Sequence, residues 1–110
     1  MPASPKTTLN LRYQLKPGAR DAMVRELETV LGLCAQEPEF ITAIIQEAPD
    51  RPEELLLFEL WRGTREDFAR VQGPKAYRKE YLQRSKQYVE TVDAVFGEPF
   101  AEWGTALLST

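Results

Sequence analysis

The sequence predicts an α+β fold in which helices cover one face of a four-stranded antiparallel sheet. Short segments either alternate apolar and polar residues or are apolar throughout, which is typical of strands. Longer segments repeat apolar residues every three or four positions, which is typical of helices. These segments follow one another as strand, helix, strand, strand, helix, strand. That order predicts a split βαβ arrangement.

The first half of the chain is predicted to hold three strands and one helix. Alternation marks the first strand, an apolar stripe that includes Met23, Leu27 and Cys34 marks the helix, and Pro38 ends it. Two further strands are joined by an acidic loop whose length permits a hairpin. The predicted elements are a strand over 8–15, a turn over 16–18, a helix over 20–36, a strand over 40–47, a loop over 48–54 and a strand over 55–61.

The second half is predicted to hold two helical segments and a last strand. Thr64 and Asp67 resemble a capping box, so a helix should begin there and end at Gly73-Pro74. Pro74 can open a second helix that runs to about Phe96. A last strand is predicted over 100–108. The whole order is that of a ferredoxin-like fold, and we expect one domain over residues 1–110, with residues 1–7 as a flexible arm.

The strand over 55–61 is apolar on both faces, which predicts that the sheet is covered on both sides. Helices cover one face only. In the simplest register the other face carries large apolar side chains, whose exposure would create an aggregation-prone apolar surface. They are Phe40, Ile44, Leu55, Leu57 and Trp61. We therefore expect a homodimer with its sheets face to face, which would form a dimeric α/β barrel.

Composition excludes several classes of function. The net charge of −3 argues against nucleic acid as a partner, and no apolar stretch is long enough to span a membrane. The chain has no His and one Cys, so metal sites and His-dependent nucleophiles are not expected. The N-terminal residues lack the apolar core of a signal peptide, and Cys34 has no partner for an internal disulfide, so we expect a cytoplasmic protein.

Glu59 is the first candidate for a functional residue. It shares a strand face with Trp61, and an unpaired carboxylate is costly to bury unless it has a partner or a wet cavity. The alternative is that Glu59 lies in water at a frayed strand end. Tyr77 and Tyr81 lie on one stripe of the predicted helix and could form either a binding wall or a core stripe. A cavity on the Glu59 face would be lined by Asn10, Arg12 and Gln14 from the first strand.

Several short motifs resemble the antibiotic biosynthesis monooxygenase domain. They are Lys16-Pro17-Gly18 after the first strand, Glu37-Pro38 before the second, Glu59-Leu60-Trp61 in the third, and an aromatic helix after Pro74. The resemblance spans residues 8–108 and implies dimeric α/β barrels, which include quinol monooxygenases and cofactor-free oxygenases of aromatic polyketides. Such proteins usually carry a His in the helix after the third strand and another after the following proline. Here those positions are Arg70 and Lys75, and without His a haem ligand is missing too.

The resemblance implies a small-molecule-binding protein that oxidises a quinol or polycyclic phenol with O₂, without a metal or cofactor. In this interpretation Glu59 is the base or orients one, Trp61 stacks on the substrate ring, and Arg70 or Arg12 stabilises the anion. Asn10 and Gln14 would bind ring oxygens, and Tyr77 and Tyr81 would form a wall. The alternative is a non-catalytic ligand-binding or assembly domain of the same fold, which the absence of His favours.

Overall fold

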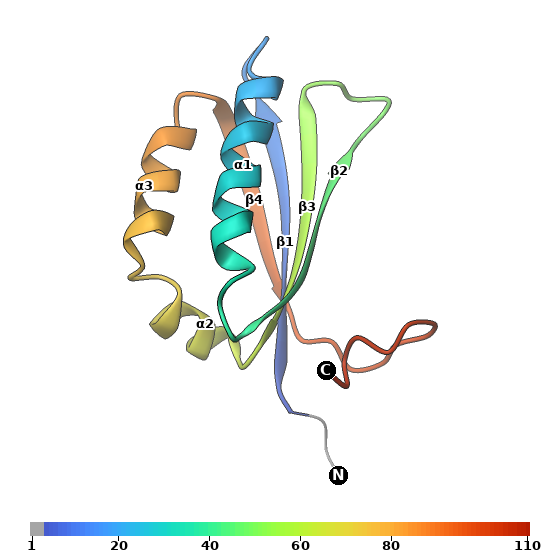
Figure 1. The fold of residues 1–110 in the computed structure, drawn as a ribbon. Helices are drawn as coiled ribbons and strands as arrows, with labels where there is room; N and C mark the ends of the chain where they lie inside the picture. Colours follow the sequence, from blue (N-terminus) through green and yellow to red (C-terminus); the bar gives the residue numbers. More distant parts are fainter. Residues whose placement is uncertain (1–3) are drawn as a thin grey trace.

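The computed structural model describes residues 4–110 and shows an open four-stranded antiparallel sheet with its helices on one face (Figure 1). The ferredoxin-like α+β prediction is confirmed. Of the predicted arm over residues 1–7, residues 1–3 lie outside the described part. Within residues 4–110 no helix is long and apolar enough to cross a membrane. The elements are β1 (Lys6–Leu15), α1 (Arg20–Cys34), β2 (Phe40–Glu47), β3 (Glu54–Arg62), α2 (Arg65–Val71), α3 (Ala76–Ser85) and β4 (Val89–Gly97).

The last strand lies earlier in the chain than predicted. The helix expected to reach Phe96 ends at Ser85, and residues 89–97 pair with β1 as an edge strand. Residues 100–108, predicted as a strand, form none. Val89, Val92 and Phe96 fit helical spacing as well, which caused the error. The β-branched residues of this segment favour a strand, and pairing places Val92 opposite Tyr13 and Phe96 opposite Leu9.

The strand register decides which side chains face the helices. Because Leu9 lies opposite Glu59 and Tyr13 lies opposite Leu55, these residues share a face, and that face packs on α1 in the core. The predicted uncovered face was therefore wrong for four of its members: Phe40, Leu55, Leu57 and Trp61 belong to the core or pack against it. Ile44 does lie on the uncovered face, together with Asn10, Arg12, Phe58 and Val95.

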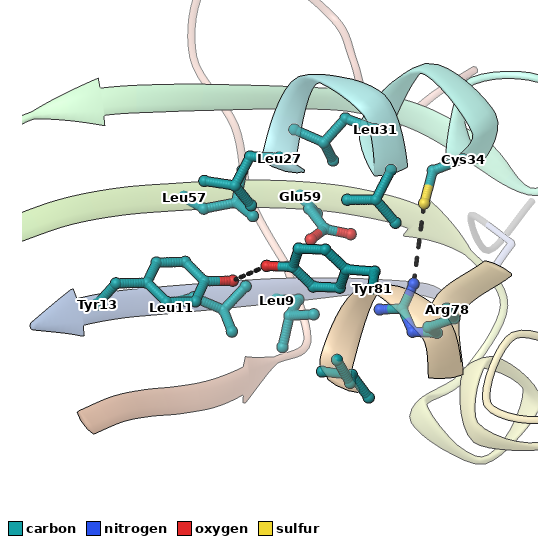
Figure 2. Close-up of a pocket in the computed structure, with 12 residues that line it drawn as sticks. Leu9, Leu11, Tyr13, Leu27, Leu31, Cys34, Leu57, Glu59, Arg78 and Tyr81 are labelled. Atoms are coloured by element: carbon teal, nitrogen blue, oxygen red, sulfur yellow. Dashed lines mark hydrogen bonds between the residues drawn. The ribbon is translucent and has the colours of Figure 1, made fainter. Parts of the chain in front are cut away.

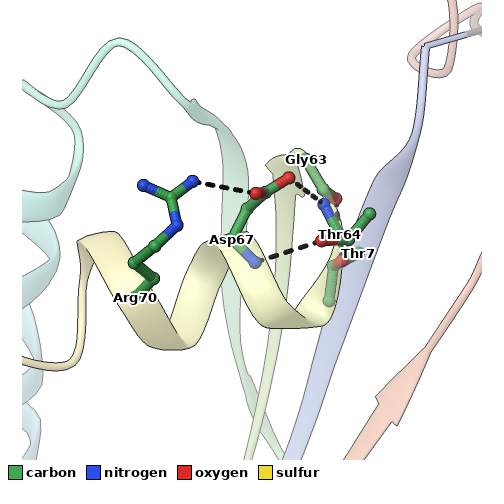
Figure 3. A network of polar contacts seen from close by, with 5 residues as sticks. All are labelled: Thr7, Gly63, Thr64, Asp67 and Arg70. Atoms are coloured by element: carbon green, nitrogen blue, oxygen red, sulfur yellow. Dashed lines mark hydrogen bonds and ion pairs between the residues drawn. The ribbon is translucent and has the colours of Figure 1, made fainter.

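A tight polar junction joins the end of β3 to the start of α2 (Figure 3). The predicted capping box is confirmed, since the Thr64 hydroxyl accepts from the Asp67 amide and the Asp67 carboxylate accepts from the Thr64 amide, both at 3.0 Å. The Thr7 hydroxyl donates to the Gly63 carbonyl at 2.9 Å, which ties this turn to β1. Gly63 has φ +100°, a conformation that side chains disfavour, so the turn suits glycine.

Candidate functional site

A small cavity of about 70 Å³ lies between the helices and the sheet (Figure 2). Its wall is mostly apolar, and polar groups reach it from two of these elements: Glu59 from β3, and Arg78 and Tyr81 from α3. The remaining lining residues are Leu9, Leu11, Tyr13, Leu27, Val30, Leu31, Cys34, Leu57 and Leu82. A cavity of this size holds a few water molecules, so it suits a reacting group rather than a whole ring system.

Glu59 is buried in this cavity, with only 4% of its surface exposed. This excludes the alternative of a carboxylate in water at a frayed strand end. The carboxylate Oε1 accepts a 2.8 Å hydrogen bond from Trp61 Nε1. Burial raises the pKa of Glu59, while the Trp61 hydrogen bond and the positive charge of Arg78 oppose that rise. A carboxyl group with a raised pKa keeps its proton to higher pH and is a stronger base once it is ionised.

Two tyrosines extend the polar part of the cavity. The hydroxyls of Tyr13 and Tyr81 lie 3.3 Å apart and form a buried hydrogen bond between β1 and α3 (Figure 2). Burial is the main reason that the pKa of each of these tyrosines is raised, so both hydroxyls keep their protons. Because one hydroxyl donates to the other, the pair offers one neutral hydrogen-bond donor beside Glu59.

Arg78 is the cation of this cavity. The centre of its guanidinium lies 4.8 Å from the centroid of the Phe68 ring, and its Nη1 lies 3.8 Å from Cys34 Sγ. Within residues 4–110 no carboxylate lies within 4.0 Å of it. Arg78 was not among the residues predicted for the site. The available signal was its spacing, because a residue three positions before Tyr81 shares a helix face with it.

Cys34 was predicted to lie on the apolar stripe of a helix, and it is buried in the core. Burial raises the pKa of its thiol, with Arg78 opposing. The Tyr77 hydroxyl lies 3.9 Å from its sulfur and donates to Glu37 at 3.1 Å, and Glu37 pairs with Lys75 at 3.0 Å. Tyr77 therefore lies behind Cys34 and connects it to the surface, whereas Tyr81 lies in the cavity.

Trp61 and Arg70 do not line the Glu59 cavity. The Trp61 ring is 1% exposed and packs edgewise between Phe40 and Phe68, with ring centroids 5.2 Å away on each side. Arg70 lies on the surface and pairs with Asp67 at 2.9 Å (Figure 3). Stacking by Trp61 and anion stabilisation by Arg70 therefore have no geometric support in this arrangement. The positions suggest that Trp61 orients Glu59.

The predicted ligands from β1 lie on the opposite face of the sheet. Asn10, Arg12 and Gln14 alternate with the residues that face the helices, so they point away from Glu59. Arg12 pairs with Glu54 at 2.8 Å, and the Asn10 amide donates to the Val95 carbonyl at 3.3 Å. The expected grouping of these three residues with Glu59 and Trp61 was wrong. Sequence alternation places residues within one strand but does not say which faces of two strands match.

A larger groove of about 610 Å³ opens beside the cavity, between α3 and β4. Four residues line both spaces: Leu11, Tyr13, Tyr81 and Leu82. The outer groove adds an apolar wall from Val89, Val92 and Ala94, with Lys86 and Glu90 also contributing. Its volume is in the range of ligand pockets, so a flat ring in the groove would place one edge toward Tyr13 and Tyr81.

Comparisons with known proteins agree with this architecture. The sequence profile described as antibiotic biosynthesis monooxygenase matches residues 7–79. No curated protein matches the chain. Solved structures with a similar fold include a Mycobacterium tuberculosis protein, with 19% identity, TM-score 0.78, and coverage of 90% of this chain and 99% of that one.

Another similar structure is a Nitrosomonas europaea protein, described as a candidate antibiotic biosynthesis monooxygenase, with 17% identity, TM-score 0.78 and coverage of 94% and 98%. At these identities the structures show the fold alone. The sequence profile covers well over half of the chain, and it decides the family. This chain belongs to the antibiotic biosynthesis monooxygenase family.

Proposed function

We propose that the protein is a cofactor-independent monooxygenase that oxidises a quinol or polycyclic phenol with O₂. One observation carries the proposal: a buried carboxylate, Glu59, shares a cavity with a tyrosine pair and a cation, and that cavity adjoins a groove large enough for a flat ring system. Family membership supports the reaction class, and the geometry supports the roles of individual residues.

The reaction balances without an added reductant. The substrate gains one oxygen atom and loses two hydrogens, while the second oxygen atom of O₂ leaves as water with those two hydrogens. The substrate supplies all four electrons that reduce O₂. Removal of the phenol proton gives an electron-rich phenolate, which passes one electron to O₂. Recombination forms a C–O bond and a peroxide, and cleavage of the O–O bond with loss of water gives the quinone.

Each polar residue of the cavity has its own role in this reaction. Glu59 takes the phenol proton and later returns it to the peroxide oxygen. Arg78 stabilises the negative charge on the phenolate and on the peroxide. The Tyr13–Tyr81 hydroxyl pair donates one hydrogen bond to the substrate oxygen, and the apolar groove excludes water from the ring. Trp61 positions the Glu59 carboxylate.

We also propose that two copies associate through the uncovered sheet face. This face carries an open groove of about 530 Å³ lined in part by Ile44, Leu56, Phe58 and Val95. Ile44 and Val95 are 52% and 62% exposed, which is a large apolar exposure for a single face. A second copy of the same face would remove this surface from water.

The test of the activity is O₂ uptake by purified protein with a panel of hydroquinones and anthrones. We expect turnover that Glu59→Gln abolishes and that Arg70→Met, a change of an exposed arginine outside the cavity, leaves intact. Quinone formation should match O₂ consumed. Saturable binding of these compounds without O₂ uptake would instead identify a non-catalytic ligand-binding protein, and no binding at all would remove the groove as a site.

A further inference from the structure

The small cavity has an outer part, which it shares with the groove at Tyr13 and Tyr81, and an inner part of its own. We call the inner part the inner chamber. Glu59 and Arg78 line it together with aliphatic side chains of α1, β1 and β3, and none of these residues lines the groove. In Figure 2 Arg78 lies at the opposite end of the cavity from Tyr13. A ring whose oxygen is bound by the tyrosine pair therefore leaves the inner chamber to a second molecule.

The aliphatic side chains make up most of the wall of the inner chamber. They are Leu9 from β1, Leu27, Val30 and Leu31 from α1, and Leu57 from β3. All of them except Leu31 are buried, with no more than 6% of their surface exposed. Such a wall offers few hydrogen-bond partners, so it favours a molecule without charge or strong dipole over water or an ion.

The volume of the cavity limits the size of this second molecule. An apolar protein cavity of about 150 Å³ binds benzene or xenon. The whole small cavity, of which the inner chamber is a part, measures about 70 Å³. A diatomic gas fits into this space, whereas a second aromatic ring does not.

Arg78 adds one positive charge to the apolar wall. In the part of the chain that the structure describes, no carboxylate lies within 4.0 Å of its guanidinium, so no ion pair neutralises it. Neutral O₂ needs no cation, but the superoxide that forms when a phenolate gives up one electron is an anion. Glu59 is the other charged group of the chamber, and it is neutral at that stage because it has taken the phenol proton. The chamber is therefore apolar toward the reactant and cationic toward its reduced form.

We propose that the inner chamber is the binding site for O₂, and that the gas and the substrate ring meet at the tyrosine pair. This inference rests on the proposed oxidation of a quinol or phenol. The phenolate loses one electron, O₂ gains it and becomes superoxide beside Arg78, and the two radicals recombine to form the C–O bond. The proton stays on Glu59 until it passes to the peroxide oxygen.

Steady-state kinetics at varied O₂ and varied quinol test the site. Val30→Ile adds one methylene group to the chamber wall, and a change of one methylene in a pocket typically alters kcat/KM by about tenfold or more. We expect kcat/KM for O₂ to fall by about that factor, while the KM for the quinol stays nearly unchanged. Val24→Ile, on the same helix but outside the cavity, is the matched control and should change neither value. A raised quinol KM with kcat/KM for O₂ intact would place part of the substrate in the chamber and overturn the proposal.

A second measurement uses the wild-type protein and needs no turnover. Xenon is an apolar probe for gas sites, and NMR of methyl-labelled protein under xenon should show saturable shifts at Leu27, Val30 and Leu57. The groove methyls of Val89 and Val92 should shift little. Quinol turnover without xenon shifts in the chamber would overturn the oxygen site and leave the proposed function. Xenon shifts in the chamber of a protein that oxidises none of the compounds would overturn both the proposed function and the oxygen site.

Discussion

The indole nitrogen of Trp61 holds the carboxylate of Glu59 with a 2.8 Å hydrogen bond between two residues on the same face of β3. Both partners therefore come from one strand, so no helix is needed to bring them together. The indole ring is locked in turn between Phe40 and Phe68. An aromatic core thus sets the direction of a polar group in the cavity.

Glu59→Gln should change how stability depends on pH. Burial raises the pKa of Glu59 in the folded protein, so the folded state binds its proton more tightly than the unfolded state does. The free energy of unfolding contributed by this group therefore falls as pH rises from about 4.5 through the folded pKa. Gln has no proton to lose, so the variant should gain stability relative to wild type as pH rises.

Urea denaturation at several pH values from 4 to 8 measures this difference. Glu53→Gln, at an exposed position before β3, is the control. Its free energy of unfolding should depend on pH in the same way as that of wild type. A Glu59→Gln curve that also runs parallel would contradict a buried, proton-binding Glu59. A loss of several kcal/mol at every pH would instead mean that a buried cation depends on the carboxylate.

Trp61→Phe should raise the pKa of Glu59 further. The Trp61 N–H stabilises the carboxylate form, and Phe keeps an aromatic ring but has no donor. The acidic limb of the pH–rate profile should therefore move to higher pH, and stability should fall by about 2 kcal/mol. Trp103→Phe changes the exposed tryptophan and is the control. An unmoved acidic limb in Trp61→Phe would show that the hydrogen bond does not tune the base.

Arg78→Met should reduce kcat far more than it reduces binding. The guanidinium is the cation nearest to the proposed anionic intermediates, and loss of such a group typically costs about 10²-fold in rate. Arg70→Met removes an arginine that pairs with Asp67 at the surface and should keep kcat within about twofold. Steady-state kinetics with one quinol substrate compare the two. Equal effects from both substitutions would remove Arg78 from the mechanism.

The hydroxyl pair of Tyr13 and Tyr81 should couple energetically. Tyr81→Phe leaves the buried Tyr13 hydroxyl without its hydrogen-bond partner, and Tyr13→Phe does the same to the Tyr81 hydroxyl. Each substitution should therefore lower the free energy of unfolding by about 1–2 kcal/mol. The double substitution removes both groups and should cost less than the sum of the single changes. Urea melts of the four proteins complete the cycle. Strict additivity would indicate that the hydroxyls do not interact.

The sequence predicted the topology because turns and periodicities are local signals. Lys16-Pro17-Gly18, Pro38 and the Thr64–Asp67 box all mark real boundaries. It failed at β4 because Val89, Val92 and Phe96 satisfy helical spacing, and only pairing with Leu15, Tyr13 and Leu9 selects the strand. Local sequence carries no information on a partner strand that lies more than seventy residues earlier.

The candidate site was predicted only in part for the same reason. Glu59 and Tyr81 were identified from their own neighbourhoods, and both line the cavity. Asn10, Arg12 and Gln14 were assigned to the wrong face, because both faces of β3 are apolar and the register of two strands cannot be read from either alone. Arg78 was missed because it lies among other charged residues. Such a residue is assigned to the exposed surface of a helix unless the packing of that helix is known.

The order β2-β3-β1-β4 places the first strand in the middle of the sheet, with β3 on one side and β4 on the other. During synthesis β1 leaves the ribosome first, yet both of its neighbours are made much later. Thr8 must wait for Gly97, its partner on β4, so the central strand keeps an open edge until nearly the whole sheet has been translated. Contacts this distant in sequence slow folding. The nascent chain therefore keeps one edge of β1 open to mispairing until β4 is made, even after β3 has paired.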